Sequence, residues 1–83
     1  LGEIENAAMC QPGIENAAAV FDAEKQQIVL FVQTSAQLVL RRLNLELKKL
    51  IPSYMLPGRL VCMEKLPHTP NDKIDRVRLK TML

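Results

Sequence analysis

The 83-residue sequence is poor in aromatic residues, with no Trp, one Tyr and two Phe. A sheet that binds RNA needs exposed aromatic side chains on which bases stack. Phe21, Phe31 and Tyr54 are the only aromatics, and no RNA-recognition signature surrounds them. The net charge of +2 is also mild for a dedicated nucleic-acid binder. A small nucleic-acid-binding α/β module is therefore only an alternative, and we expect no nucleic-acid partner.

Long apolar runs and clustered metal ligands are missing as well. No stretch approaches the roughly 20 apolar residues of a membrane span, and no secretory signal is recognisable. Cys10 and Cys62 lie far apart, with only His68 as a further soft ligand, so we expect no bound metal. Two free thiols favour a reducing compartment. We therefore predict a cytoplasmic location and no membrane partner.

Signatures of self-contained catalysis are absent from the sequence. It has no Gly-rich phosphate loop, no Ser nucleophile in an elbow context and no metal-binding His pair. Glu3 and Glu5 lie two residues apart on an expected helix, so they face different directions and make a poor acid–base pair. A chain this short forms one small domain, and a deep private active site is not expected.

The apolar pattern predicts a short helix followed by a hairpin. Leu1, Ile4 and Ala8 fall at helical spacing, and Pro12-Gly13 supplies a stop. The apolar runs "AAAVF" and "IVLFVQ" are separated by the polar segment "DAEKQQ", which is typical of two strands joined by a loop. We expect Phe21 and Phe31 near the packed face of this hairpin.

A longer helix, a third strand and a last helix are predicted next. Thr34 or Ser35 is a suitable cap for a helix that ends at Pro52, with a stripe formed by Val39, Leu43, Leu47 and Leu50 together with Leu40 and Ile51. The segment "RLVCMEK" suits a strand. Asp75 is a suitable cap for a short final helix, with Ile74 and Leu79 placed to form a hydrophobic staple.

The predicted order is thus α-β-β-α-β-α. We expect an α+β domain with a small three-stranded, mainly antiparallel sheet and helices covering one of its faces.

The loop "PNDKIDR", residues 70–76, presents one lysine between two acids. The plain interpretation of Lys73 is a solvated surface charge. Asn71 and Asp72 tolerate unusual backbone angles, however, so a turn anchored between a strand and a capped helix would hold Lys73 away from the body. The sequence predicts a cation that is projected and not buried.

The segment "IPSYMLPGRLVCMEKLPHTPNDKIDR", residues 51–76, closely resembles the final core motifs of amino-acid adenylation domains of nonribosomal peptide synthetases and their stand-alone relatives. "LGEIE" resembles the segment just after the hinge of these adenylate-forming enzymes. Related acyl-CoA synthetases and luciferases usually carry a Ser-Gly-Lys loop, whereas the Asn-x-Lys-x-Asp-Arg pattern here is similar to the amino-acid branch. An acyl-CoA synthetase subdomain is the alternative.

The resemblance implies that residues 1–83 are the mobile C-terminal subdomain, or lid, of a longer ligase whose large N-terminal domain is absent. ATP and Mg²⁺ would be bound mainly by that domain, and the isolated fragment would be inactive. Lys73 would be the catalytic residue that stabilises charge during adenylation of an amino acid or related carboxylate. The lid would then rotate to present Gly2 and Glu3 toward the phosphopantetheine thiol of a carrier protein.

The residues around the lysine are expected to position its loop. This set comprises Asn71, Asp72, Asp75 and Arg76. Asp72 departs from the family pattern, which usually has Gly there, and it places a carboxylate beside Lys73. Arg76 is expected to pair with Asp72 or Asp75, and Glu3 is either polar lining of the thiol path or an acid at a helix terminus.

Overall fold

The computed structural model describes residues 2–83. Its elements follow the predicted order α-β-β-α-β-α, with one additional 3₁₀ turn, η1. They are α1 (Gly2–Met9), β1 (Asn16–Asp22), β2 (Gln27–Gln33), α2 (Leu40–Leu47), η1 (Ser53–Met55), β3 (Arg59–Met63) and α3 (Arg76–Lys80). Leu1, which the sequence pattern assigns to the first helix, lies outside the described residues.

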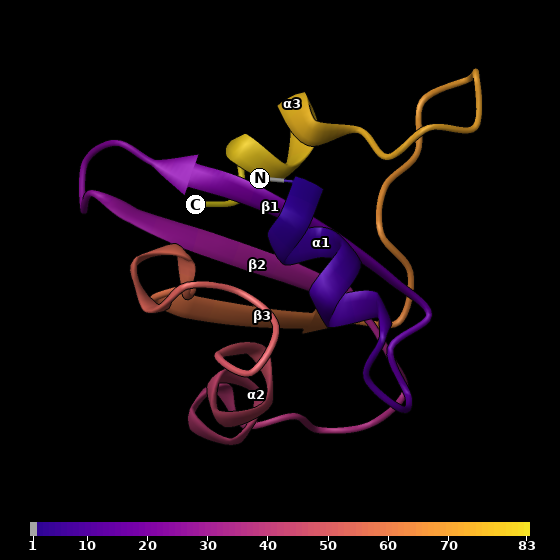
Figure 1. Cartoon of the computed structure of the whole chain (residues 1–83). Helices are drawn as coiled ribbons and strands as arrows, with labels where there is room; N and C mark the ends of the chain where they lie inside the picture. The colour runs from indigo at the N-terminus through magenta and orange to yellow at the C-terminus, as the bar shows by residue number, and fades with distance from the viewer. Residues whose placement is uncertain (1) are drawn as a thin grey trace.

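The three strands form a mixed sheet in the order β1-β2-β3 (Figure 1). β1 and β2 pair antiparallel, with Val20 opposite Val29, whereas β3 runs parallel to β2, with Phe31 opposite Val61. The expectation of a mainly antiparallel sheet is therefore wrong for the second pairing. Because α2 lies between β2 and β3, the chain crosses back before β3 begins, and such a crossover is the connection that a parallel pair needs.

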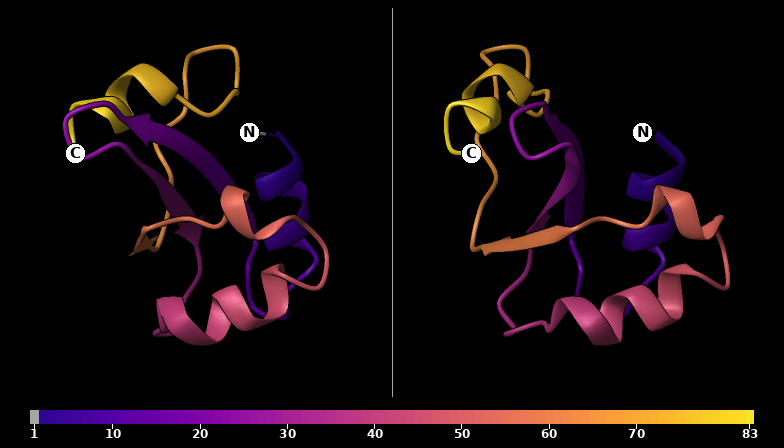
Figure 2. Two further views of the ribbon diagram at one scale, coloured as in Figure 1. Left: turned by 60° about the vertical axis from the view of Figure 1, so that its left-hand side comes forward. Right: turned by 90° about the vertical axis from the view of Figure 1, so that its left-hand side faces the viewer.

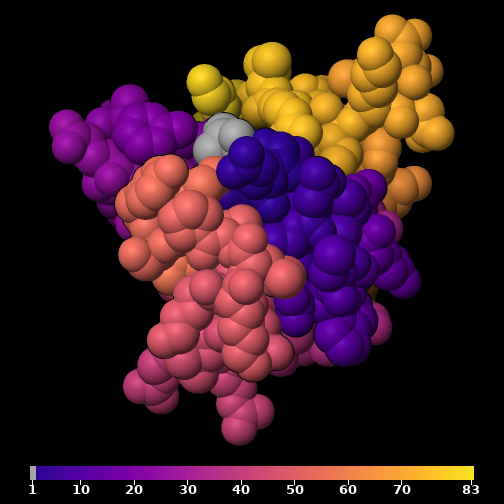
Figure 3. Space-filling model, in the orientation of Figure 1, coloured from indigo at the N-terminus to yellow at the C-terminus, as the bar shows by residue number. Residues whose placement is uncertain are grey.

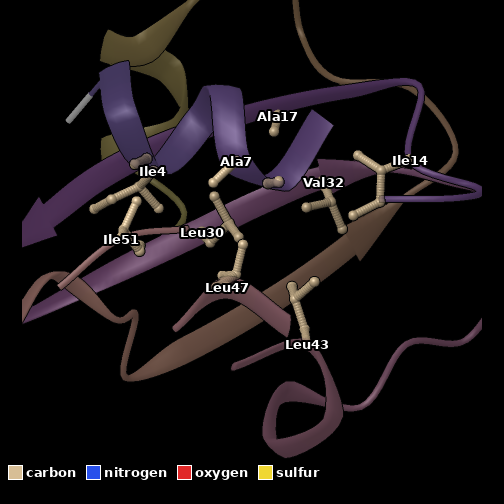
Figure 4. Packing of buried hydrophobic residues seen from close by; sticks show 11 residues of the cluster. Ile4, Ala7, Ile14, Ala17, Leu30, Val32, Leu43, Leu47 and Ile51 are labelled. Atoms are coloured by element: carbon tan, nitrogen blue, oxygen red, sulfur yellow. The ribbon is translucent and has the colours of Figure 1, made fainter. Parts of the chain in front are cut away.

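Helices cover both faces of the sheet, which corrects the expectation of one covered face. Figure 2 shows α1 and α2 on one side of the sheet and α3 on the other. Figure 4 shows side chains from α1, β2 and α2 meeting in the larger cluster, which includes Ile4, Leu30 and Leu47. Phe31 and Leu79 belong to the cluster on the opposite face. Burial on both faces explains why the two hairpin strands are continuous apolar runs.

The second helix is shorter than the sequence predicts. It begins at Leu40, with Val39 as an N-cap that makes no side-chain hydrogen bond. Thr34 instead turns the chain after β2, because its Oγ1 accepts a hydrogen bond of 3.1 Å from the Ala36 N–H. The helix ends at Leu47, before Pro52. Of the predicted stripe, Leu43, Leu47 and Ile51 are buried, while Val39 and Leu50 are each 57% exposed.

The last helix, α3, begins where the sequence predicts. Asp75 is its N-cap, and the side chain accepts a hydrogen bond of 3.0 Å from the Arg78 N–H. Leu79 is fully buried and Ile74 packs against the same cluster, so the two residues of the predicted staple share one apolar cluster. α3 is only five residues long, so its position depends on this cap and on Leu79.

The two phenylalanines give a matched test of which face is packed. Phe31→Ala should lower the free energy of unfolding by about 3–5 kcal/mol, because the substitution leaves a cavity. The Phe31 ring is 1% exposed, whereas Phe21 is 48% exposed. Phe21→Ala should therefore cost only about 1 kcal/mol. Urea unfolding followed by circular dichroism measures both, and equal losses would contradict the packing of Phe31.

Candidate functional site

Residues 69–73, here called the lysine loop, form a tight turn that stands clear of the body of the domain (Figure 3). The Asp72 N–H donates to the Thr69 carbonyl oxygen at 2.9 Å, and the Thr69 N–H donates to the Lys73 carbonyl oxygen at 2.7 Å. Pro70 occupies the second turn position, for which its fixed φ is suited. Both bonds join residues of the loop itself, so they set the shape of the loop without contacts to the rest of the domain.

The base of the lysine loop is closed by further backbone contacts. The Asp75 N–H donates to the Pro67 carbonyl oxygen at 2.8 Å, and His68 forms a bridge with Ile74. On the first side of the loop, Leu66 is buried and its N–H donates to Oε1 of Gln33 at 3.1 Å. The loop is therefore a short arm held at its base and free at its tip.

Asp72 occupies the one strained backbone position of the lysine loop. Its φ is +64°, in the left-handed region that favours glycine. Asp is among the few other residues that visit this region, because its short polar side chain bonds locally. The structure thus explains why this position suits Gly and how Asp is tolerated there.

The lysine side chain is presented to solvent at the tip of the arm. Asn71, Asp72 and Lys73 are all exposed. Among residues 2–83, no side chain forms a salt bridge or hydrogen bond with the Lys73 ammonium group. The arrangement therefore offers a positive charge that forms no ion pair within these residues, on a turn anchored at its base, and such a charge is suited to an anionic ligand.

Arg76 pairs with neither Asp72 nor Asp75, and the expectation of those partners is wrong. Asp75 is used in the helix cap, while Arg76 Nη2 donates to Glu5 Oε1 at 3.0 Å and its Nη1 donates to Oε2 of the same carboxylate. The Ala19 N–H also donates to Glu5 Oε2, at 2.7 Å. Glu5 is thus a buried acid with a fork-shaped cationic partner.

Sequence reasoning missed the role of Glu5 because it considered this acid only as a poor acid–base partner of Glu3. Its position beside Ile4 and three residues before Ala8 places it on the border of the apolar stripe of α1. An acid on that border needs a partner when it is buried. The sequence therefore indicated that Glu5 needs a partner. It did not indicate which residue is the partner, because Arg76 lies 71 residues away.

The other candidate residues lie on α1 and in the loop before the lysine. Gly2 and Glu3 are exposed at the start of α1, and a Cβ added at Gly2 would meet no atom within 4 Å. Glu3 borders a shallow depression together with Cys10 and Pro52. His68 is half-buried, and its Nδ1 lies 2.7 Å from the Leu66 carbonyl oxygen. Within residues 2–83, no hydrogen bond or salt bridge joins Gly2 or Glu3 to the lysine loop.

The described residues carry no clustered metal ligands and no membrane-spanning helix. Between Gly2 and Leu83, no group of three or more His, Cys, Asp or Glu side chains is placed to hold a metal ion. No helix in this part of the chain is long and apolar enough to cross a membrane. Cys10 is exposed and Cys62 half-buried, and both are free thiols.

Comparison with known proteins identifies related chains. The family model described as "AMP-binding enzyme C-terminal domain" matches residues 3–73. Gramicidin S synthase 2 of Brevibacillus brevis is 33% identical over 82 residues, which cover 95% of this chain and 2% of that protein. The chain therefore spans a small part of the curated relative that it matches.

Two solved structures share the fold. NpsA of Klebsiella oxytoca, solved in complex with 3-hydroxyanthranilyl-AMSN, is 26% identical with a TM-score of 0.86, covering 95% of this chain and 16% of that one. An acyl-CoA synthetase of Brucella canis is 24% identical with a TM-score of 0.83, covering 98% of this chain and 16% of that one. At that identity, the second likeness concerns the fold alone.

The geometry of the lysine loop predicts how substitutions at position 72 behave. Asp72→Val should cost about 1–2 kcal/mol in the loop, because a β-branched side chain fits the left-handed region poorly. The amide protons of Thr69 and residue 72 should then exchange roughly 5- to 30-fold faster. Asp72→Gly is the control and should not accelerate exchange. Equal exchange rates in the two variants would contradict the φ of +64°.

Proposed function

The chain belongs to the family of AMP-binding enzyme C-terminal domains, and we propose that it is the mobile lid of a longer adenylate-forming ligase. That ligase activates an amino acid, or a related carboxylate, with ATP and then transfers it to the phosphopantetheine thiol of a carrier protein. The observation that carries this proposal is Lys73, an exposed cation at the tip of an anchored arm. The missing partner in this scheme is the large N-terminal domain that holds the nucleotide.

Lys73 acts in the first half-reaction. The carboxylate oxygen attacks the α-phosphorus of ATP, the bond to the bridging oxygen breaks, and pyrophosphate leaves. Negative charge builds up on the α-phosphoryl oxygens while the attacking carboxylate is still charged. A lysine that enters a closed, water-poor cleft stabilises both groups without any proton transfer. Exposure of the side chain in the isolated domain supports this role, because a lid residue must be free before closure.

In the proposed ligase, this chain and the N-terminal domain contribute different groups to the binding of ATP and Mg²⁺. Mg²⁺ prefers several oxygen ligands in octahedral geometry. Residues 2–83 hold no group of three or more His, Cys, Asp or Glu side chains placed to bind a metal ion. When bound by the N-terminal domain, Mg²⁺ would neutralise charge on the ATP phosphates. Among residues 2–83, Lys73 is the group that we assign to ATP. In this proposal ATP and Mg²⁺ belong mainly to the other domain.

The second half-reaction requires the lid to turn. Thioester formation needs the carrier thiol where the lysine loop had been, so withdrawal of the loop after adenylation gives ordered catalysis. Gly2 and Glu3, exposed on α1, are the residues that we assign to the thiol path in the rotated state. Absence of a Cβ at Gly2 leaves open space beside the backbone, which supports close approach by a narrow pantetheine chain.

Two observations favour the amino-acid branch over the alternatives. The motif Asn71-x-Lys73-x-Asp75-Arg76 is intact, and the gramicidin S synthase 2 match covers 95% of this chain at 33% identity. The likeness to an acyl-CoA synthetase is a likeness of fold. A nucleic-acid-binding sheet would need an open face for bases, whereas α1 and α2 cover one face here and α3 covers the other.

Substitution of the lysine separates the two half-reactions. In the intact ligase, Lys73→Ala should slow ATP–pyrophosphate exchange on the order of 10²–10³-fold, by analogy with loss of one oxyanion donor. Transfer from preformed acyl-adenylate to the carrier thiol should be nearly unchanged, because the loop is withdrawn at that stage. Lys80→Ala removes another exposed lysine and is the control. Equal loss in both half-reactions would refute the role of Lys73.

The carboxylate of Asp72 should oppose the approach of the lysine loop to ATP. Asp72→Asn keeps a residue that tolerates the left-handed backbone and removes the charge. The pyrophosphate-exchange rate at low ATP should rise roughly 1.5- to 5-fold, as expected for an exposed charge interaction of about 0.2–1 kcal/mol. The gain should shrink at high salt. Glu64→Gln, another exposed acid, is the control, and an equal gain there would contradict a local effect.

A further inference from the structure

The Glu5 carboxylate joins three parts of the chain at the outer edge of the sheet. Glu5 belongs to α1 on one face, Arg76 to α3 on the other, and Ala19 to β1, the edge strand between them. The carboxylate accepts the Ala19 N–H and both guanidinium nitrogens. Its side chain is 11% exposed, and that of Arg76 is 49% exposed. We call this contact the Glu5–Arg76 clamp.

The clamp constrains the orientation of the Arg76 guanidinium group as well as pairing its charge. A guanidinium group held by two parallel N–H···O bonds has a defined plane, so the pair constrains orientation more strongly than a single contact does. The carboxylate is oriented in turn by the Ala19 N–H, which comes from a rigid strand. Arg76 is consequently bonded to α1 directly and connected to β1 through the Glu5 carboxylate.

Arg76 lies three residues after Lys73 and is the first residue of α3. The first side of the lysine arm is anchored by buried Leu66 and its bond to Gln33. After Lys73 the chain leads back into α3. There the clamp is the first side-chain contact that connects this part of the chain to α1. Without it, the bonds within the loop and at its base would still keep the shape of the arm. The clamp is placed to help hold the angle between the arm and the body.

We propose that Glu5 and Arg76 are positioning residues that aim the lysine loop. Through them, α1 with Gly2 and Glu3 moves as one rigid body with Lys73 when the lid turns. This inference rests on the proposed function of Lys73 and adds to it the residues that set its direction. Displacement of about 1 Å at a reacting group costs as much as 10²-fold in rate, so loss of the aim has a kinetic signature.

Two conservative substitutions test the clamp in the intact ligase. Arg76→Lys keeps the charge and removes the planar fork, and Glu5→Gln keeps an acceptor for the Ala19 N–H and removes the charge. Each should lower the kcat of ATP–pyrophosphate exchange about 10- to 100-fold. The KM for the carboxylate substrate should stay unchanged, because its pocket lies in the other domain. Transfer from preformed adenylate should be affected less than adenylation.

The same substitutions in a Lys73→Ala background separate positioning from general destabilisation. If the clamp acts by aiming Lys73, Arg76→Lys should cause no further loss of exchange once that lysine is gone. A purely structural defect would lower the remaining rate by the same factor again. Arg78→Lys on the same helix and Glu46→Gln on α2 are the matched controls, and both should leave exchange unchanged.

The outcomes distinguish this inference from the proposal on which it rests. Normal exchange in both Arg76→Lys and Glu5→Gln, with a large loss in Lys73→Ala, would overturn the clamp and leave the role of Lys73 intact. Full additivity in the Lys73→Ala background would also overturn it. Normal exchange in Lys73→Ala itself would remove the proposed function and the clamp together. Non-additive losses confined mainly to adenylation would establish the clamp.

Discussion

The fold of this small domain depends on how a buried carboxylate at the sheet edge is compensated. Glu5 would carry a large desolvation cost without partners, and it receives the Ala19 N–H and the Arg76 guanidinium. The same contact satisfies one polar group of an edge strand, a position where unpaired backbone groups invite pairing with other chains. One side chain thereby bonds an outer N–H group of β1 and connects helices from opposite faces of the sheet.

Apolar clusters on both faces stabilise the small sheet, which supports the rest of the domain. β2 is the central strand and supplies Leu30 and Val32 to one cluster and Val29 and Phe31 to the other. A chain of 83 residues buries a smaller fraction of its surface than a larger domain does. Packing both faces of the same strands increases the apolar area that these strands bury. If Lys73 acts as we propose, the direction in which it is held depends on how firmly this sheet supports the base of the arm.

The lysine arm combines a fixed base with an exposed tip. Its internal bonds hold Thr69, Asp72 and Lys73 in one turn, while the ammonium group stays in solvent. Such an arrangement suits a group that acts only when another domain closes over it. Asp72 modifies this design, since it retains the left-handed backbone and adds a negative charge next to the cation. Opposite charges therefore lie on neighbouring residues at the exposed end of the loop.

The sequence alone determined the features that local chemistry controls. These were the order of the elements, the cap at Asp75, the left-handed tolerance of Asp72 and the exposure of Lys73. Its motifs also indicated the family. Only the tertiary structure decided the parallel pairing of β3, the second covered face and the union of Glu5 with Arg76. Caps and turns involve residues within a few positions of one another, whereas these other contacts depend on how distant segments stack, which no local pattern specifies.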